Sequence, residues 1–384
     1  MKILLTGSCS DGIVLPMTSF AWALRAAGHE VLVSGPPNVR PLVTGAGLPF
    51  APYRDPVTFP DLLRKDRAGN PQSMPSGGEH ELLAHIGRGY GRLAGRTLDE
   101  ALALADDWRP DVVMSDPQGL VGGLVAGARE LPWVRLGFSM GSPPVMDDSA
   151  RAEVAPDLER LGLPALPAPA LTLDVCPPSV RRPEQTAVTG LRYVPYNGTA
   201  VLPDWLLRPR RGRRVLLTLG TQVPLRGGLG MMSQLMKTLT ADLDLEVVVA
   251  IDDTAAEELR PTPEGVLAVG RVSLNMVLPT CDLIVHHSGS GTTMTSLVAG
   301  VPQMIVPVIA ETWDYARRLD EFGVARRLTP QEADPEAVVA QCRPLLEDPS
   351  YRERAAVLRD EIAALPSPAE LALNLPELIA GGAR

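Results

Sequence analysis

The sequence contains few of the residues that mark several protein classes. Only 4% of the 384 residues are aromatic, and the 4 cysteines lie far apart without any Cys-x-x-Cys pair. This spacing argues against a disulfide framework or a zinc site, and it favours a reducing compartment. No apolar run reaches membrane-spanning length, and the first residues lack the pattern of a signal peptide. We therefore expect a cytoplasmic protein without a membrane partner.

Positive charge is also scarcer than negative charge. The chain has 36 Lys and Arg against 45 Asp and Glu, which gives a net charge of -9. Such a chain repels the phosphates of nucleic acids on average. The basic run Arg208–Arg214 is more typical of an exposed linker than of a nucleic-acid site. We expect no nucleic-acid partner.

Apolar runs that favour strands alternate with helical stretches along the whole chain. The runs are KILLTG, EVLVSG, DVVMSD, WVRLGF and LTLDVC in the first half, then RVLLTLG, LEVVVAI, VLAVG, DLIVHH and QMIVPV. Continuous Val/Ile/Leu runs are typical of parallel strands buried on both faces. The βα alternation occurs twice, which predicts an α/β chain with two doubly wound, Rossmann-like domains.

Breaks in this pattern suggest the domain boundaries. Residues 1–195 and 215–365 are expected to form the two domains, joined at 196–214 by a linker rich in Pro, Gly and basic residues. Residues 366–384 follow the break LPSP and are expected to form a helix that packs back on the first domain. A further helix is predicted at Pro16–Ala27, where Gly28 ends it.

The stretch CDLIVHHSGSGTTMTSLVAGVP, residues 281–302, concentrates the most chemistry. A strand that ends at His287 meets a turn in which Gly289 and Gly291 give conformational freedom, and a helix follows. One of three hydroxyl residues is expected to cap this helix: Ser290, Thr292 or Thr293. Free amides and the positive dipole end at a helix start suit an anion such as a diphosphate. The alternative is a small-residue turn whose histidines pair with the backbone.

Three neighbouring segments favour the anion hypothesis. TLGTQV, residues 218–223, ends a strand in a Gly-Thr turn that offers a second set of amides. GRVSLNMVLPTCD, residues 270–282, is well placed to hold a nucleobase. GVPQMIVPVIAETWDYARRL, residues 300–319, brings polar side chains just past a strand end. Ligands bind at such carboxyl ends in open parallel sheets.

These motifs resemble those of GT-B glycosyltransferases, and more narrowly of bacterial natural-product enzymes that attach deoxysugars to polyketides. The resemblance covers essentially the whole chain. It is strongest in HHSGSGT…AGVPQMIVP…ARRL, which follows the family's His-Gly-Gly-x-Gly-Thr pattern with Ser288 in place of the first glycine. The segment PALPAPALTLDVCPPSV is similar to the transferases of aromatic polyketides such as the angucyclines.

The resemblance implies two Rossmann-like domains that face each other across a cleft. The N-terminal domain would bind the acceptor, with the irregular segment Tyr53–His80 as an acceptor-side loop. The C-terminal domain would bind the activated sugar, and transfer would invert the anomeric carbon without a metal or other cofactor. The adjacent aspartates in IDDT, Ile251–Thr254, are interpreted as a helix start and not as a metal site.

The resemblance also implies roles for individual residues. Val272 would meet the nucleobase, and Glu311 with Thr312 would contact the sugar where relatives often carry Asp-Gln. The departure at Thr312 favours a dTDP-linked 2,6-dideoxy sugar. The donor diphosphate would lie among Gly220, Thr221, His287, Gly289, Ser290, Gly291 and Thr292.

The general base of the family is missing from its usual place. Relatives commonly read Gly-His-x-x-Pro after the first strand, whereas this chain has Ile13 at the histidine position, and isoleucine cannot accept a proton. Asp11 or Asp116 is then a candidate base or positions the acceptor, although a turn aspartate and a strand-end cap are the alternatives. The remaining candidates are Ser10, His80 and His85.

The loss of a base favours an acidic acceptor. A phenol has a pKa of about 10, so ionising it at pH 7 costs roughly 4 kcal/mol. General-base catalysis contributes about 10²–10⁴-fold, and its loss is tolerable where the acceptor is already acidic. We expect an aromatic, phenolic polyketide acceptor, glycosylated at oxygen or at ring carbon.

Two other functions fit the same sequence. One is a nucleotide-sugar epimerase of the same fold, which would turn over its substrate without an aglycone. The other is a subunit that binds a sugar nucleotide and needs a partner protein. The family also suggests a monomer or a homodimer.

Overall fold

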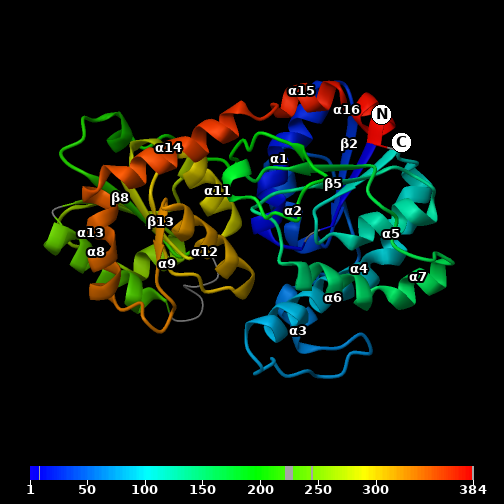
Figure 1. Cartoon of the computed structure of the whole chain (residues 1–384), viewed down its shortest axis with the longest axis horizontal. Helices are drawn as coiled ribbons and strands as arrows, with labels where there is room; N and C mark the ends of the chain where they lie inside the picture. Colours follow the sequence, from blue (N-terminus) through cyan, green and yellow to red (C-terminus); the bar gives the residue numbers. More distant parts are fainter. Residues whose placement is uncertain (8, 221–227, 244, 383–384) are drawn as a thin grey trace. The chain divides into compact units, whose positions relative to one another are not determined.

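Two compact units make up the chain in the computed structural model, which describes residues 1–7, 9–220, 228–243 and 245–382. Unit 1 combines Met1–Cys176, Arg181–Gly198 and Leu365–Arg384, and unit 2 combines Pro177–Val180 and Thr199–Ala364. The last helices of the chain therefore belong to the first unit. Each unit is built on one parallel sheet (Figure 1).

Unit 1 has a 7-stranded sheet in the order β3-β2-β1-β4-β5-β6-β7. Its strands are β1 (Lys2–Thr6), β2 (Glu30–Gly35), β3 (Phe50–Pro52), β4 (Val112–Ser115), β5 (Trp133–Leu136), β6 (Leu171–Asp174) and β7 (Thr189–Gly190). Its helices are α1 (Asp11–Ala26), α2 (Arg40–Gly45), α3 (Phe59–Arg64), α4 (Glu79–Trp108), α5 (Leu120–Ala128), α6 (Pro144–Glu153), α7 (Ala155–Leu161), α15 (Pro368–Leu373) and α16 (Leu375–Gly382).

Unit 2 has a 6-stranded sheet in the order β10-β9-β8-β11-β12-β13. Its strands are β8 (Arg214–Thr218), β9 (Glu246–Ala250), β10 (Val266–Gly270), β11 (Leu283–His286), β12 (Gln303–Ile305) and β13 (Ala325–Arg327). Its helices are α8 (Leu229–Leu243), α9 (Asp253–Glu258), α10 (Leu274–Val277), α11 (Ser290–Ala299), α12 (Trp313–Phe322), α13 (Pro335–Glu347) and α14 (Pro349–Ala364), with a 3-10 turn η6 (Ala310–Thr312).

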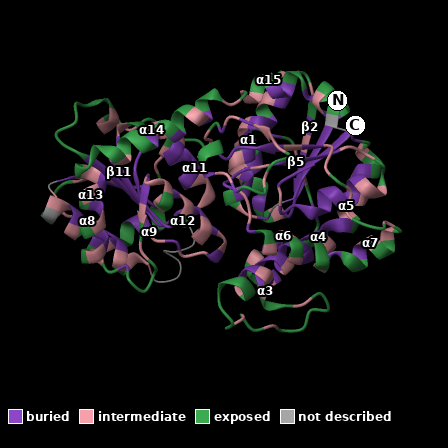
Figure 2. Cartoon of the chain, viewed as in Figure 1, coloured by how far each residue is buried: buried purple, intermediate pink, exposed green. Residues whose placement is uncertain are grey.

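Both faces of the central strands are buried, as continuous apolar runs predict. In β8, Val215 and Leu217 join one hydrophobic cluster, whereas Leu216 between them joins another. Because neighbouring side chains of a strand point to opposite faces, helices must cover both sides of the sheet. Figure 2 shows these strands as buried within each unit. The two parallel Rossmann-like sheets confirm the predicted fold class.

All the strands predicted from apolar runs are present, and the strands that were not predicted are short. The strands β3, β7 and β13 lie at or near sheet edges and have only 2 or 3 residues, too few for a periodic signal. The predicted start of α1 was wrong. This helix begins at Asp11, with Ser10 at the N-cap, and Pro16 lies inside it. Asp252 caps α9 by accepting from two backbone amides, so the helix-start interpretation is confirmed.

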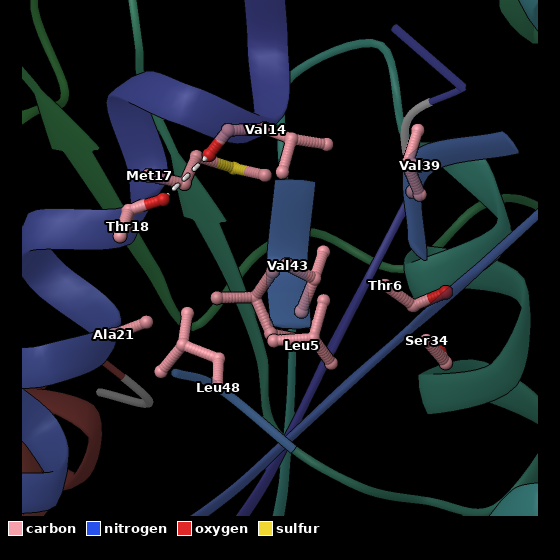
Figure 3. A pocket seen from close by; sticks show the side chains of 12 residues that line it. Leu5, Thr6, Val14, Met17, Thr18, Ala21, Ser34, Val39, Val43 and Leu48 are labelled. Atoms are coloured by element: carbon pink, nitrogen blue, oxygen red, sulfur yellow. Dashed lines mark hydrogen bonds between the residues drawn. The ribbon is translucent and has the colours of Figure 1, made fainter. Parts of the chain in front are cut away.

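A small cavity lies between α1 and the first strands of unit 1. Figure 3 shows Val14 and Met17 of α1, Leu5 of β1 and Val43 of α2 around it. Its volume is about 20 Å³, close to that of one water molecule. This pocket is therefore too small for a polyketide ring. In the part of the chain that the structure describes, no helix is long and apolar enough to cross a membrane.

Candidate functional site

Two of the predicted residues, Asp116 and His287, lie at equivalent places in the two sheets. Strand order reverses between β1 and β4 in unit 1 and between β8 and β11 in unit 2, because the first strand of each unit lies beside its fourth. In open α/β sheets, ligands bind at such switch points, outside the carboxyl ends of the strands. Asp116 directly follows β4, and His287 directly follows β11. The topology thus places both candidates where a ligand is expected.

The imidazole of His287 lies between two glycines. A Cβ atom at Gly220 would overlap its Cε1 atom, and a Cβ at Gly289 would lie 2.8 Å from its Nε2 atom. Any side chain at either position would displace the ring. Burial lowers the pKa of His287 to about 4, so the ring is neutral at pH 7. Its Nδ1 atom has no hydrogen-bond partner among the described residues.

The preceding histidine has a different, internal role. His286 is fully buried, and its Nδ1 atom accepts a hydrogen bond of 3.1 Å from the amide of Ser288. The Nε2 atom must then carry the proton and donate to Gln303 Oε1 at 2.8 Å. Burial, the main cause, and the neighbouring His287 lower the pKa of His286 to about 3. For this histidine, the alternative of a structurally paired residue is confirmed.

The helix α11 begins without a side-chain cap. Its N-cap is Gly289, so the expectation that Ser290, Thr292 or Thr293 caps the helix was wrong. The first amides of a helix have no intrahelical acceptor, and here these belong to Ser290, Gly291 and Thr292. They are half-buried, which leaves them accessible to a small anion. Thr221, also predicted to bind the diphosphate, lies outside the described residues.

The remaining donor-site predictions fall on two segments, the loop after β10 and the 3-10 turn η6. Val272 follows β10 and packs its side chain against a hydrophobic cluster, so its backbone is what it offers to a base. Glu311 is half-buried in η6, and burial raises the pKa of its carboxyl group to about 7. Thr312 is buried, and its hydroxyl donates to the carbonyl of Ile309 at 2.8 Å. The Thr312 side chain is thus already engaged.

In unit 1, the carboxyl group of Asp116 is enclosed by the backbone. A Cβ at Gly7 would overlap its Oδ2 atom, and a Cβ at Gly119 would lie 2.9 Å from it. The Oδ1 atom accepts from the amide of Gln118 at 2.9 Å, while Oδ2 has no partner among the described residues. Burial raises the pKa of Asp116 from 3.8 to about 7, opposed by hydrogen bonds and by the charge of Arg135.

The other base candidates differ in exposure. Ser10 and Asp11 lie at the start of α1, where the Ser10 carbonyl accepts from two amides and Asp11 is exposed. Ile13 is buried, so the family's histidine position is occupied by an apolar core residue. His80 is exposed on α4. His85, on the same helix, is buried and its Nε2 atom donates to the Leu63 carbonyl at 2.8 Å, which is a structural contact.

Several partners of these groups were missed from the sequence. Gly7 and Gly119 enclose Asp116, and the available signals were a glycine directly after β1 and a glycine before α5. Gln303 holds the His286 ring through a hydrogen bond. The sequence feature that could have indicated this role is that a polar residue begins the apolar run QMIVPV. Within the described residues, no cluster of three or more His, Cys, Asp or Glu side chains is arranged to hold a metal ion.

Solved structures similar to this chain include glycosyltransferases. The glycosyltransferase SsfS6 of Streptomyces sp. SF2575, in complex with thymidine diphosphate, is 44% identical to it with a TM-score of 0.87. That match covers 98% of this chain and 99% of SsfS6. Together with two Rossmann-like units, it defines the chain as a glycosyltransferase of the GT-B class.

The family follows from matches over most of the length. The erythromycin biosynthesis protein CIII-like family matches with its N-terminal domain at residues 22–220 and its C-terminal domain at residues 233–378. The chain belongs to this family, which confirms the predicted resemblance. Among its relatives, the L-demethylnoviosyl transferase of Streptomyces niveus is 39% identical over 378 residues, 98% of this chain and 97% of the relative. The aclacinomycin-T 2-deoxy-L-fucose transferase of Streptomyces galilaeus is 32% identical over 432 residues, 99% and 96% of the two chains.

Proposed function

We propose that this enzyme transfers a 2,6-dideoxy sugar from a dTDP-sugar to a phenolic polyketide, at oxygen or ring carbon, with inversion of the anomeric carbon. The observation that carries the proposal is the whole-length similarity to a glycosyltransferase bound to thymidine diphosphate, together with the uncapped helix start beside His287. A relative named as a 2-deoxy-L-fucose transferase supports a deoxysugar.

The donor diphosphate is held by neutral groups of unit 2. The amides of Ser290, Gly291 and Thr292 point outward from the positive end of α11, which favours an anion. His287 is neutral at pH 7, and a neutral imidazole donates one hydrogen bond to a phosphate oxygen. Gly220 and Gly289 keep side chains away from the ring. These contacts strengthen as negative charge develops on the leaving diphosphate.

The sugar segment suits a donor with few hydroxyl groups. Because the Thr312 hydroxyl already donates to Ile309, it offers little to a sugar hydroxyl. Glu311 is half-buried and, with a pKa of about 7, exists in both protonation states near neutral pH. Its carboxyl group can therefore donate a hydrogen bond to the sugar or accept one from it.

Asp116 is the favoured proton acceptor. Transfer of a proton from a phenol of pKa about 10 to a carboxylate of pKa about 7 costs roughly 4 kcal/mol. The same transfer to an unperturbed aspartate costs roughly 8 kcal/mol. Burial of Asp116 thus removes about half of the free-energy cost of this proton transfer. Asp11, at the start of α1, and Ser10 before it orient the acceptor in this proposal.

The reaction balances without a metal or redox partner. The phenol oxygen, or the ring carbon activated by it, forms a bond to the anomeric carbon as the bond from that carbon to the phosphate oxygen breaks. The acceptor proton passes to Asp116, and thymidine diphosphate leaves with the electron pair of the broken bond. Displacement from the opposite face inverts the anomeric configuration.

The test is an assay of the purified chain with a dTDP-2,6-dideoxy sugar and a panel of phenolic polyketides. We expect a glycoside with inverted configuration, at an unchanged rate in EDTA, and acid treatment separates labile O-glycosides from stable C-glycosides. Turnover of the sugar nucleotide without an acceptor would point to an epimerase. Transfer only after addition of a second protein would point to a dependent subunit.

A further inference from the structure

Ser288 has a backbone conformation that suits glycine better. Its φ angle is 69°, in the left-handed region, and its side chain is fully buried. The related pattern has a glycine here, which adopts this conformation without steric cost, whereas a residue with a Cβ atom does so with strain. An interaction made by the serine must offset that strain.

The hydrogen bonds of Ser288 identify that interaction. Its amide donates to His286 Nδ1 at 3.1 Å, and His286 is itself held by Gln303. This amide is therefore engaged inside the protein and does not face an anion. The Ser288 hydroxyl donates to the carbonyl of Thr312 at 3.2 Å, which a glycine could not do.

This second hydrogen bond joins two parts of the donor site. One part is the turn between β11 and α11, which carries His287 and Gly289. The other is the 3-10 turn η6, in which Thr312 follows Glu311 and closes the turn by donating to the Ile309 carbonyl. The Ser288 hydroxyl thus ties η6 to the turn between β11 and α11.

We propose that Ser288 is a positioning residue that fixes Glu311 relative to the donor diphosphate. It thereby controls recognition of the sugar, while the nucleotide binds independently of it. This inference rests on the proposed donor site. The serine in place of glycine is then a specificity determinant for the donor sugar, and the strain of the left-handed turn is offset by the bond to η6.

The test uses Ser288→Gly, which retains the favourable backbone and removes only the hydroxyl. Loss of one buried hydrogen bond corresponds to a change of about fivefold to tenfold. We expect the KM for the dTDP-sugar to rise by about that factor, while the Kd of thymidine diphosphate, measured by calorimetry, stays within about twofold. Ser288→Ala should show the same rise in KM but unfold at a lower temperature than Ser288→Gly, because alanine retains the strain.

Ser296→Ala is the matched control. Ser296 is a fully buried serine of α11 whose hydroxyl bonds to the Thr292 carbonyl within the helix, so its loss leaves η6 untouched. We expect an unchanged donor KM. A double-mutant cycle of Ser288→Gly with Glu311→Gln should show a smaller effect of the second substitution in the first background, because the two residues act together.

Other outcomes separate this inference from the proposed function. The role of Ser288 would be overturned by an unchanged donor KM in Ser288→Gly or by additive effects in the cycle. It would also be overturned if Ser288→Gly weakened the binding of thymidine diphosphate and of dTDP-sugar equally. A wild-type chain that binds thymidine diphosphate but transfers no sugar, or binds neither ligand, would instead overturn the proposed function, and the inference with it.

Discussion

At the scale of single residues, burial sets the protonation of the groups that are proposed to react. His287 and Asp116 are both buried, so water stabilises their charged forms poorly, and both are shifted towards the neutral form. For the histidine this gives a neutral hydrogen-bond donor at pH 7. For the aspartate it gives a carboxyl group that ionises near neutral pH and accepts a proton more readily than an exposed one.

The substitution Asp116→Asn should raise stability and lower activity. The folded pKa of about 7 exceeds the ordinary 3.8, so between these values the unfolded chain ionises first and stability falls as pH rises. Asparagine lacks this ionisation. We expect its stability gain over wild type to grow by roughly 2–3 kcal/mol from pH 5 to pH 8, measured by denaturant unfolding.

The activity of the same variant tests the role of Asp116 as the base. Transfer to a phenol should fall by about 10²-fold or more, and the wild-type rate should rise with pH through about 7 as the carboxyl ionises. Asp107→Asn, at an exposed position of α4 outside the predicted acceptor-side loop, controls for the loss of one carboxylate. The assignment would be contradicted if the difference in unfolding free energy between Asp116→Asn and wild type did not change with pH. A full transfer rate in Asp116→Asn would contradict it as well.

At the scale of elements, α4 supplies hydrogen bonds to the C-terminal end of α3. This helix of 6 residues ends near Arg92, whose Nη1 atom donates to the carbonyls of Leu62 and Lys65 at 2.8 and 3.1 Å. The Nε atom of Arg92 also contacts Glu153 of α6 at 3.3 Å. A helix this short is marginal alone, so α4 holds part of the predicted acceptor-side loop in place.

Arg92→Met should loosen this loop. It leaves two carbonyls without their donor and Glu153 without its ion pair, and breaking a buried pair costs about 3 kcal/mol. We expect a lower melting temperature and a KM that rises for the aglycone and not for the dTDP-sugar. Arg96→Met removes an exposed arginine of the same helix and should change neither value. Equal changes in both KM values would exclude a specific role of α3 in acceptor binding.

At the scale of the whole molecule, the two sheets divide the proposed chemistry. Unit 2 carries Gly220 and His287 at its switch point, and unit 1 carries Asp116 at its own. Binding of a nucleotide to the native chain alone stabilises it by mass action, by about 2.7 kcal/mol when the ligand is at 100 times its Kd. The homodimer, the cytoplasmic location and the absence of a nucleic-acid partner stay predictions.

Thymidine diphosphate should therefore raise the melting temperature in a concentration-dependent way. In His287→Ala, a charge-assisted hydrogen bond worth about 1.5–3 kcal/mol is lost, so about 10- to 100-fold more ligand is needed for the same shift, and turnover falls by orders of magnitude. His80→Ala, on the exposed surface of unit 1, should leave the curve unchanged. An identical curve for His287→Ala would exclude this histidine from the diphosphate site.

The sequence by itself determined the longer strands, the alternation with helices and the segment around His287. These features are local, because an apolar run, a glycine turn and a helix start each need only neighbouring residues. It misplaced what depends on packing. Pro16 indicated a helix start but lies inside α1, and hydroxyls were expected to cap α11 where Gly289 stands.

Only the tertiary structure decided the surroundings of the candidate groups. Strand pairing brings Gly7 to Asp116 and Gly220 to His287, although each pair is far apart in the chain. Burial then shifts the pKa of each group, and burial depends on every neighbour at once. Ser288 shows the same division: the sequence records a serine for a glycine, whereas its left-handed backbone and its bond to Thr312 exist only after folding.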